Sequence, residues 1–264
     1  MASRQIVLCA DDYGLSPGIS RGIRELLATA RLSATSCMTI YPEFAADGPK
    51  LRPYLDSADI GLHFTLTDTD RSLAAVAAGT FLRPPKLADI IREVERQAEL
   101  FEEIVGAPPA YIDGHQHIHL FPVIRDAVVE VAKKLGAYVR VTTESLDLAL
   151  ARRPAAAEAA WLSLMSRTLA RLAQRNGVPT NNGFRGPRNF REKTEYRDLF
   201  CAMIAGVGDG CIVMCHPGHS DAMLAERDNV LQARDEELRY FASDDFPRDL
   251  ANANLTLGRL RFTA

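Results

Sequence analysis

Residues 111–122 of the 264-residue chain read Y-I-D-G-H-Q-H-I-H-L-F-P, and three of the six histidines of the sequence lie in this stretch. A short run typical of a β-strand, residues 110–113, leads directly into His115, His117 and His119. In an extended backbone these three rings share one face, where partly charged groups would crowd unless they bind something. The stretch therefore predicts a strand that ends at a binding or metal site.

The remaining histidines also follow strand-like runs. His63 lies in G-L-H-F-T-L-T at the end of a predicted strand. His216 and His219 lie in C-H-P-G-H, directly after the apolar run 211–215. Histidines placed for surface or core reasons would not collect beside strand ends in this way, so these stretches are expected to converge on one site.

Two adjacent carboxylates complete the set. Asp11 and Asp12 follow the apolar run 5–10, which is typical of a strand buried on both faces. The candidate carboxylates and histidines thus stand at the carboxyl ends of strands. In barrels and open parallel sheets, that edge is where active sites are built.

Strand-like and helix-like segments alternate along the whole chain. Strands are expected at residues 5–10, 34–41, 59–66, 110–113, 138–143 and 211–215, with further short strands within 181–190 and after residue 255. Helices are expected from Pro17 and over 87–105, 122–135, 155–175, 194–205 and 226–242, and a loop is expected over 68–86. This alternation implies parallel strands joined by right-handed crossovers. We therefore expect an α/β fold in which residues 1–264 form a single domain, a distorted TIM-like (β/α) barrel of about seven parallel strands.

The composition narrows the classes of partner. The formal net charge is −3, so nucleic acid is not an expected partner. No apolar run has the length of a membrane span, and the first residues lack the segments of a signal peptide. The five cysteines form no C-x-x-C pair and are expected to be reduced. These features predict a cytoplasmic protein, and they leave a homodimer open.

The residue types in these stretches suit metal-assisted hydrolysis. A catalytic zinc typically takes three ligands from His, Asp and Glu and keeps one position open for water. The metal lowers the pKa of that water, and a second carboxylate can accept its proton. Each motif also has a plainer interpretation: the Asp pair could be a turn and helix cap, and His63 a hydrogen-bonded structural residue. These plainer interpretations would require four independent coincidences at one edge of the sheet, so we favour the interpretation as a single site.

Other chemistries have weaker support in the sequence. It has no G-x-S-x-G elbow, Walker loop or G-x-G-x-x-G motif. Cys215 precedes His216 but lies in an apolar run, where an inert core thiol is the expected interpretation. Arg185 and Arg188 lie on a Gly-containing loop, where they could bind an anionic or sugar oxygen or simply be solvated.

The order of the motifs resembles that of one family. A-D-D-Y-G-L-S at residues 10–16, G-L-H-F-T-L-T at 61–67, D-G-H-Q-H-I-H-L-F-P at 113–122 and C-H-P-G-H at 215–219 resemble the YdjC-like carbohydrate deacetylases. That family includes chito-oligosaccharide deacetylases and a hopanoid-associated branch. The resemblance implies a distorted (β/α) barrel related to polysaccharide deacetylases, one divalent metal ion (zinc or magnesium), and removal of an N-acetyl group from an amino sugar.

The resemblance also implies roles for individual residues. Asp12, His63 and His115 would bind the metal, Asp11 would be the general base, and His216 would be the general acid. We further expect the substrate to be contacted by Tyr13, His117, His119 and Arg185.

The expected function is therefore metal-dependent N-deacetylation of a small-molecule carbohydrate. The alternatives are a metal phosphoesterase or other amidohydrolase, an Fe(II) site of two His and one carboxylate for oxygen chemistry, and a sugar-binding protein with a vestigial site.

Overall fold

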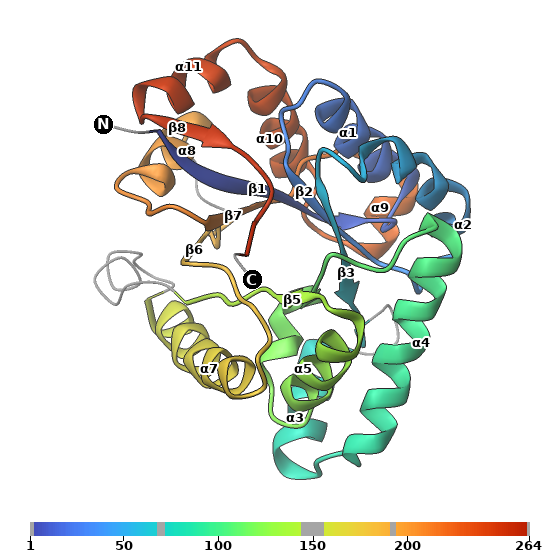
Figure 1. Ribbon diagram of the computed structural model, residues 1–264. Coiled ribbons are helices and arrows are strands. Elements are labelled where there is room, and N and C mark those ends of the chain that lie inside the picture. The colour runs from blue at the N-terminus through green and yellow to red at the C-terminus, as the bar shows by residue number, and fades with distance from the viewer. Residues whose placement is uncertain (1–2, 68–71, 144–155, 191–193, 263–264) are drawn as a thin grey trace.

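A curved sheet of parallel strands forms the centre of the molecule (Figure 1). The computed structural model describes residues 3–67, 72–143, 156–190 and 194–262. Within these residues the strands are β1 (Arg4–Tyr13), β2 (Ala34–Cys37), β3 (Asp59–Phe64), β4 (Tyr111–Gly114), β5 (Tyr138–Val139), β6 (Phe184–Arg185), β7 (Cys211–Cys215) and β8 (Leu255–Leu257).

Helices connect the strands and surround the sheet. They are α1 (Pro17–Ala28), α2 (Glu43–Asp47), α3 (Leu73–Leu82), α4 (Leu87–Val105), α5 (Ile124–Leu135), α7 (Ala156–Arg175), α8 (Tyr196–Ile204), α9 (Ala222–Arg227), α10 (Gln232–Ala242) and α11 (Asp245–Asn252), with the 3-10 segments η1 (Gly48–Tyr54) and η2 (His115–Leu120). Among the residues that the structure describes, none of these helices is both long enough and apolar enough to span a membrane.

The strand order makes a nearly closed barrel. The main path runs β5-β4-β3-β2-β1-β7-β6, and every pairing along it is parallel. The two ends of this path approach each other, because Val139 of β5 forms a parallel bridge with Thr180, just before β6. The backbone N–H of Val139 donates to the carbonyl of Pro179 at 3.0 Å. The predicted distorted (β/α) barrel is therefore confirmed.

Alternation along the strands separates an inner from an outer core. Ile6, Leu8 and Ala10 of β1 point outward and pack with buried residues of α1, α8, α10 and α11. On the other side of the barrel, outward residues of β3, β4 and β5 pack with α3, α4, α5 and α7. Val7 and Cys9 point inward, where they meet side chains from five other strands, including Tyr111, Tyr138 and Phe184. The interior is thus a packed core.

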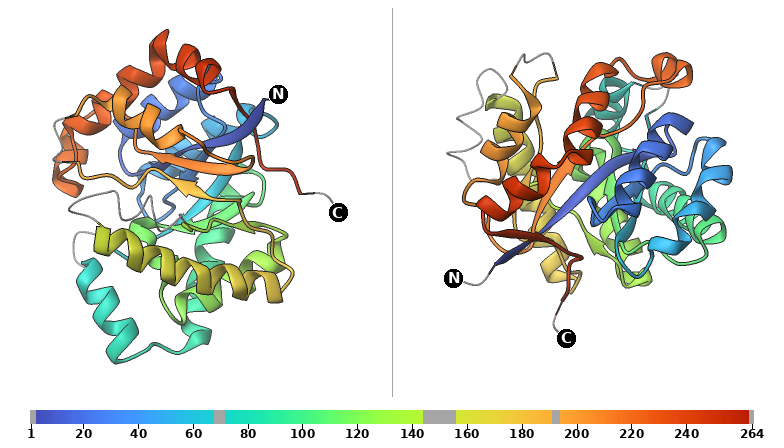
Figure 2. Two further views of the ribbon diagram at one scale, coloured as in Figure 1. Left: turned by 90° about the vertical axis from the view of Figure 1, so that its left-hand side faces the viewer. Right: turned by 90° about the horizontal axis from the view of Figure 1, so that it is seen from above.

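The C-terminal segment covers the end of the barrel at which the strands begin. β8 pairs with the first residues of β1. Beyond it, Arg259 Nε donates to Asp59 Oδ1 at 2.7 Å, and the backbone N–H of Leu260 donates to Asp59 Oδ2 at 2.9 Å. Both chain ends lie on this side of the molecule (Figure 2). The opposite edge, where the strands end, carries the polar motifs.

The expected loop over residues 68–86 is wrong for residues 73–82. Residues 68–71 lie outside the described residues, but α3 occupies Leu73–Leu82. The Oγ atom of Ser72 accepts a hydrogen bond from the N–H of Ala75 and caps the helix. The segment is rich in alanine and almost uniformly apolar, so its high helix propensity lacks the periodicity by which an amphipathic helix is recognised.

The expected continuous helix over 226–242 is also wrong. α9 ends at Arg227 and α10 begins at Gln232. Asp228 has an extended backbone, and its side chain accepts a hydrogen bond from the N–H of Val230 at 3.0 Å. Such a local side-chain bond competes with the helical pattern and ends it.

Gly61 offers a test of the interior packing. A Cβ atom there would lie 2.4 Å from the ring of Tyr111, which fills the barrel. We expect Gly61→Ala to lower the free energy of unfolding by about 1–3 kcal/mol, measured by urea denaturation, because the ring must move. Gly79→Ala in α3 is the control: nothing lies within 4 Å of the added atom, so helix propensity predicts no loss of stability. Equal effects of the two changes would contradict this packing.

Candidate active site

A bulge at the end of β1 brings two consecutive carboxylates to the same cavity. The pairing of β1 with β2 shifts register between Ala10 and Tyr13. Asp12 has φ of 70°, in the left-handed region that a non-glycine residue rarely occupies. In a regular strand Asp11 and Asp12 would point to opposite faces. The bulge re-aims one of them, so both line the cavity at the open end of the barrel.

The cavity has a volume of about 420 Å³. Its lining comes from the ends of most of the strands and includes Asp11, Asp12, His63, His115, His117 and His216 from the sequence motifs. The size is typical of a small-molecule site. Residues expected to act together from four distant parts of the chain therefore share one cavity.

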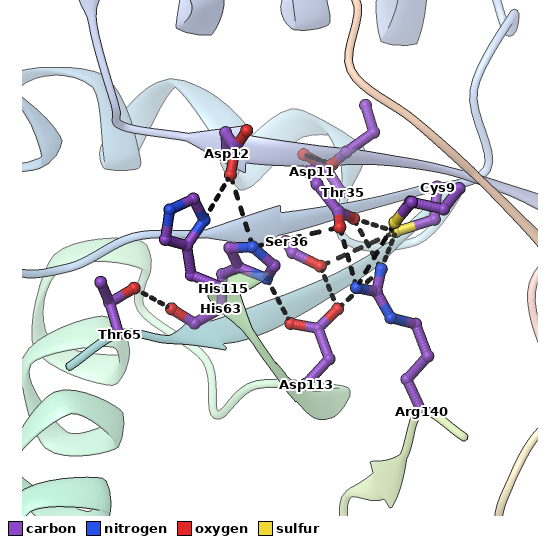
Figure 3. Close-up of polar contacts among 12 residues, drawn as sticks. Cys9, Asp11, Asp12, Thr35, Ser36, His63, Thr65, Asp113, His115 and Arg140 are labelled. Carbon is purple, nitrogen blue, oxygen red and sulfur yellow. Dashed lines mark hydrogen bonds and ion pairs between the residues drawn. The ribbon is translucent and has the colours of Figure 1, made fainter. Parts of the chain in front are cut away.

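Three side chains form a group that suits a metal ion (Figure 3). Asp12 Oδ1 lies 3.1 Å from His115 Nδ1 and 3.4 Å from His63 Nε2. One ligand atom from each residue lies within 4.8 Å of the other two. Two imidazole nitrogens and one carboxylate oxygen are a common donor set for catalytic zinc, and the open cavity beside them leaves room for water and substrate.

Arg234 donates a hydrogen bond to Oδ2, the other oxygen of Asp12. Its NH2 atom donates to Asp12 Oδ2 and to Asp228 Oδ2, each at 2.6 Å. Both Arg234 and Asp12 are almost fully buried. Burial by itself would raise the pKa of Asp12, but Arg234 and the two histidines hold it well below its usual range. Asp12 is therefore ionised, with one oxygen directed toward the histidines.

Asp113 orients His63 through Nδ1, the ring nitrogen that does not face Asp12 (Figure 3). Its Oδ1 lies 2.6 Å from His63 Nδ1, while its Oδ2 accepts from Ser36 Oγ at 2.6 Å and pairs with Arg140 NH1 at 2.9 Å. A carboxylate on the far nitrogen fixes the tautomer of a metal-binding histidine and raises its basicity. The Nε2 atom of His63 is thereby directed to the carboxylates at the cavity.

Arg140 links Asp113 to Asp11. It is fully buried, and its NH1 and NH2 atoms donate to the two oxygens of Asp11 at 2.6 and 2.8 Å. Although burial opposes ionisation, the guanidinium lowers the pKa of Asp11, and that of Asp113 is lowered to about 2. Both carboxylates stay ionised in the interior of the barrel.

The buried carboxylates carry more negative charge than the neighbouring guanidiniums neutralise, so the site can accept a further cation. Asp11, Asp12 and Asp113 face the guanidiniums of Arg140 and Arg234, and Arg234 is shared with Asp228. Although burial favours the neutral imidazole, Asp113 and Asp11 raise the pKa of His63 to about 10. A proton on His63 supplies one of the two positive charges that a divalent ion would bring. The residues therefore fit a metal in charge as well as in donor type.

His216 stands at the end of β7 on the wall of the cavity. Its ring packs edge-on against Phe190 with centroids 5.5 Å apart. Burial lowers the pKa of His216, which is therefore mainly neutral near pH 7. His219, from the same motif, lies outside the lining of this cavity and pairs with Glu25 at 2.8 Å.

The expectation of an extended histidine cluster with one shared face is wrong. Residues 115–120 form η2, in which Gln116 and His117 have left-handed φ values of 52° and 59°. The chain turns back so tightly that His119 lies against the Cα atom of Gly114, where a Cβ atom would be 2.9–3.0 Å from it. The three rings are separated by this turn.

The three histidines consequently have different surroundings. His115 faces Asp12. His117 lines the cavity, and its ring packs edge-on against Phe184. His119 is fully buried, with Nε2 at 3.0 Å from the carbonyl of Arg140, so its expected contact with substrate is corrected to a structural one.

Two further expected substrate contacts lie elsewhere. Tyr13 is fully buried, and its hydroxyl donates to the carbonyl of Asp47 at 2.7 Å, in the outer core. Arg185 is outside the described lining of the cavity and donates to the carbonyl of Phe184 at 2.8 Å. The bulge at Asp12 turns Tyr13 away from the site. Arg188, on the same loop as Arg185, is the arginine that lines the cavity.

Asp113, Arg140 and Arg234 were not predicted as site residues. Asp113 and Arg140 lie within predicted strands, at residues 110–113 and 138–143. A charged residue in an otherwise apolar strand signals a buried partner, and this signal could have revealed both. Arg234 lies in a charged helical segment and gives no such signal.

A comparison with known sequences decides the family. The model of the YdjC-like proteins matches residues 5–252. The chain belongs to the YdjC-like family.

Two relatives of known name and one solved structure show the extent of the similarity. The chain is 28% identical to a carbohydrate deacetylase of Geobacillus stearothermophilus, over 96% of both chains. It is also 28% identical to a chitooligosaccharide deacetylase of Yersinia pestis, over 83% of both. A solved Enterococcus faecalis structure, described as that of a proposed cellobiose-phosphate cleavage protein, superposes with a TM-score of 0.75 at 18% identity and 98% coverage of both chains. This structural likeness supports the fold.

The Asp113–His63 contact predicts an effect on metal binding. We expect Asp113→Asn to weaken zinc binding by about 10- to 100-fold, measured by calorimetry on metal-free protein, because His63 loses its carboxylate partner. Asp59→Asn is the control, since Asp59 is equally buried but lies at the beginning of β3. Unchanged zinc affinity in Asp113→Asn would contradict this role.

The pKa of His63 predicts a proton release. Below about pH 10 the metal-free site holds a proton on His63, and a metal needs that nitrogen unprotonated. Zinc binding at pH 8 should therefore release about one proton for His63, and affinity should rise with pH up to about 10. Calorimetry in buffers of different ionisation enthalpy measures the release.

The same raised pKa of His63 stabilises the metal-free fold below about pH 6.5, and this contribution to stability is lost as the pH rises through about 10.

Proposed function

We propose that this protein is a metal-dependent hydrolase that removes the N-acetyl group from an N-acetylated amino sugar. The observation that carries the proposal is the Asp12–His63–His115 group, in one cavity with a further carboxylate, Asp11, and a further histidine, His216. The names of the similar family members, carbohydrate deacetylase and chitooligosaccharide deacetylase, support the same reaction.

Asp12, His63 and His115 would hold the metal. When bound, a divalent ion supplies Lewis acidity for the acetyl carbonyl and lowers the pKa of water. The rest of the reaction depends on the chain's own groups, which must move one proton from the attacking water to the leaving amine.

Asp11 is the proposed general base. Arg140 fixes both of its oxygens, yet a carboxylate retains further lone pairs and can accept the proton of the water that adds to the acetyl carbon. Its lowered pKa means that the proton is held only briefly. The buried guanidinium thus positions the base and keeps it ionised.

His216 is the proposed general acid. Its pKa is lowered by burial, so the imidazole is neutral at rest and gives up a proton readily once it receives one. Once the proton that Asp11 took from the water has passed to His216, its donation to the amide nitrogen lets the C–N bond break, and acetic acid and the free amine leave. His117, which also lines the cavity, is proposed to contact the substrate.

The charged side chains that line the cavity favour a neutral sugar over a phosphoester as substrate. Arg188, Arg227 and Arg234 line the cavity, and a phosphoryl group would need guanidinium N–H groups that point to it. The charge of each is already compensated by a carboxylate, from Glu237, Glu43 and Asp12 respectively, although NH1 of Arg234 has no hydrogen-bond partner among the described residues. This pairing supports the amide hydrolase over the phosphoesterase.

The test is acetate release from N-acetylglucosamine oligomers with zinc or magnesium added. We expect Asp11→Asn to lower kcat by about 100-fold or more, because the base is lost, and His115→Ala to lose activity together with metal. His219→Ala is the matched control, since His219 pairs with Glu25 outside the cavity. Wild-type rates in both Asp11→Asn and His115→Ala would show that the site is wrong.

A further inference from the structure

Two aromatic rings on the wall of the cavity are supported by arginines. Tyr41 and Phe190 both line the cavity and are partly exposed. The guanidinium of Arg227 lies over the Tyr41 ring, 4.5 Å from its centroid, and that of Arg188 lies over the Phe190 ring at 4.8 Å. Each ring therefore has one face against a cation, an attractive arrangement that fixes its orientation.

Carboxylates in turn hold the two guanidiniums. Nε and NH2 of Arg188 both donate to Glu237 Oε1, at 3.0 and 2.8 Å, and this pair is almost completely buried. Arg227 donates to both oxygens of Glu43, at 2.9 and 3.2 Å, and to the carbonyl of Leu15 at 2.6 Å. The charge of each arginine is therefore compensated, and its guanidinium is held in place against the ring that it supports.

The two rings stand on opposite sides of the candidate catalytic groups. Tyr41 follows β2 and Phe190 follows β6, and the sheet order places β1 and β7 between those strands. β1 supplies Asp11 and β7 leads to His216, whose ring lies 5.5 Å from that of Phe190. A ligand on Phe190 would thus lie next to the proposed acid, and a longer ligand would extend toward Tyr41.

We propose that Phe190 and Tyr41 form two stacking subsites for neutral N-acetylated sugar rings. The apolar C–H face of a pyranose packs on an aromatic face, and a ring already held in place loses little entropy on binding. Phe190 takes the sugar that reacts, and Tyr41 takes its neighbour in an oligosaccharide. The assignment rests on the proposed function, because it places the reacting sugar beside His216.

The experiment separates the two subsites by ligand length. Binding of N-acetylglucosamine and N,N′-diacetylchitobiose is measured by calorimetry in the Asp11→Asn background, and KM and kcat are measured for each ring variant with Asp11 intact. We expect Phe190→Ala to weaken both ligands by about tenfold and Tyr41→Ala to weaken only the disaccharide, with the larger change in KM. Phe190→Tyr and Tyr41→Phe should retain binding, which a merely misfolded site would not.

Phe262→Ala is the matched control, since Phe262 is an exposed ring that packs on Tyr138 away from the cavity. Acetate release with KM unchanged in both alanine variants would overturn the subsites and leave the proposed function intact. Sugar binding that the alanine variants weaken, without any acetate release by the wild type, would support the subsites and sink the proposed function. A wild-type protein that neither binds nor deacetylates these sugars would overturn both.

Discussion

The buried guanidinium of Arg140 is the interaction on which the site depends. It lies inside the barrel with no exposed surface and pairs with Asp11 and Asp113. Removing one partner from such a buried group typically costs about 3–5 kcal/mol, because the remaining charge stays desolvated. Arg140 is therefore the main reason why Asp11 is ionised within an apolar barrel and why an ionised Asp113 can orient His63. The proposed base and the carboxylate that orients a proposed metal ligand share one cation.

The interior of the barrel changes character along its axis. At the end where the strands begin, it is filled by apolar side chains such as Val7, Tyr138 and Phe184, beneath the C-terminal segment. Cys9, Ser36 and the Tyr111 hydroxyl form a polar layer above them, linked by hydrogen bonds to Asp113. The charged residues and the cavity come last. The apolar side chains exclude water from the end of the barrel at which the strands begin. The buried ion pairs therefore act at low dielectric and hold their geometry.

The fold, and the residues that line the candidate site, could be predicted from local patterns. The apolar run 5–10 and the alternation of strands with helices specify parallel pairing, and parallel pairing places Asp12, His63, His115 and His216 at one edge. The errors arose where local pattern was a poor guide. α3 lacks periodicity, Asp228 interrupts a helix through one side-chain bond, and η2 depends on left-handed residues that resemble any polar loop.

The sequence by itself determined which residue types stand at the carboxyl ends of the strands, because a strand of period two and its following loop are local features. Only the tertiary structure decided which of them act together. The bulge at Asp12 turned Tyr13 into the outer core, and the turn at Gln116 separated His115 from His119. Arg140, Asp113 and Arg234 became partners of Asp11, His63 and Asp12 because the charges buried inside the barrel must balance. That balance is a sum over residues up to 222 positions apart in the chain, and no local pattern contains it.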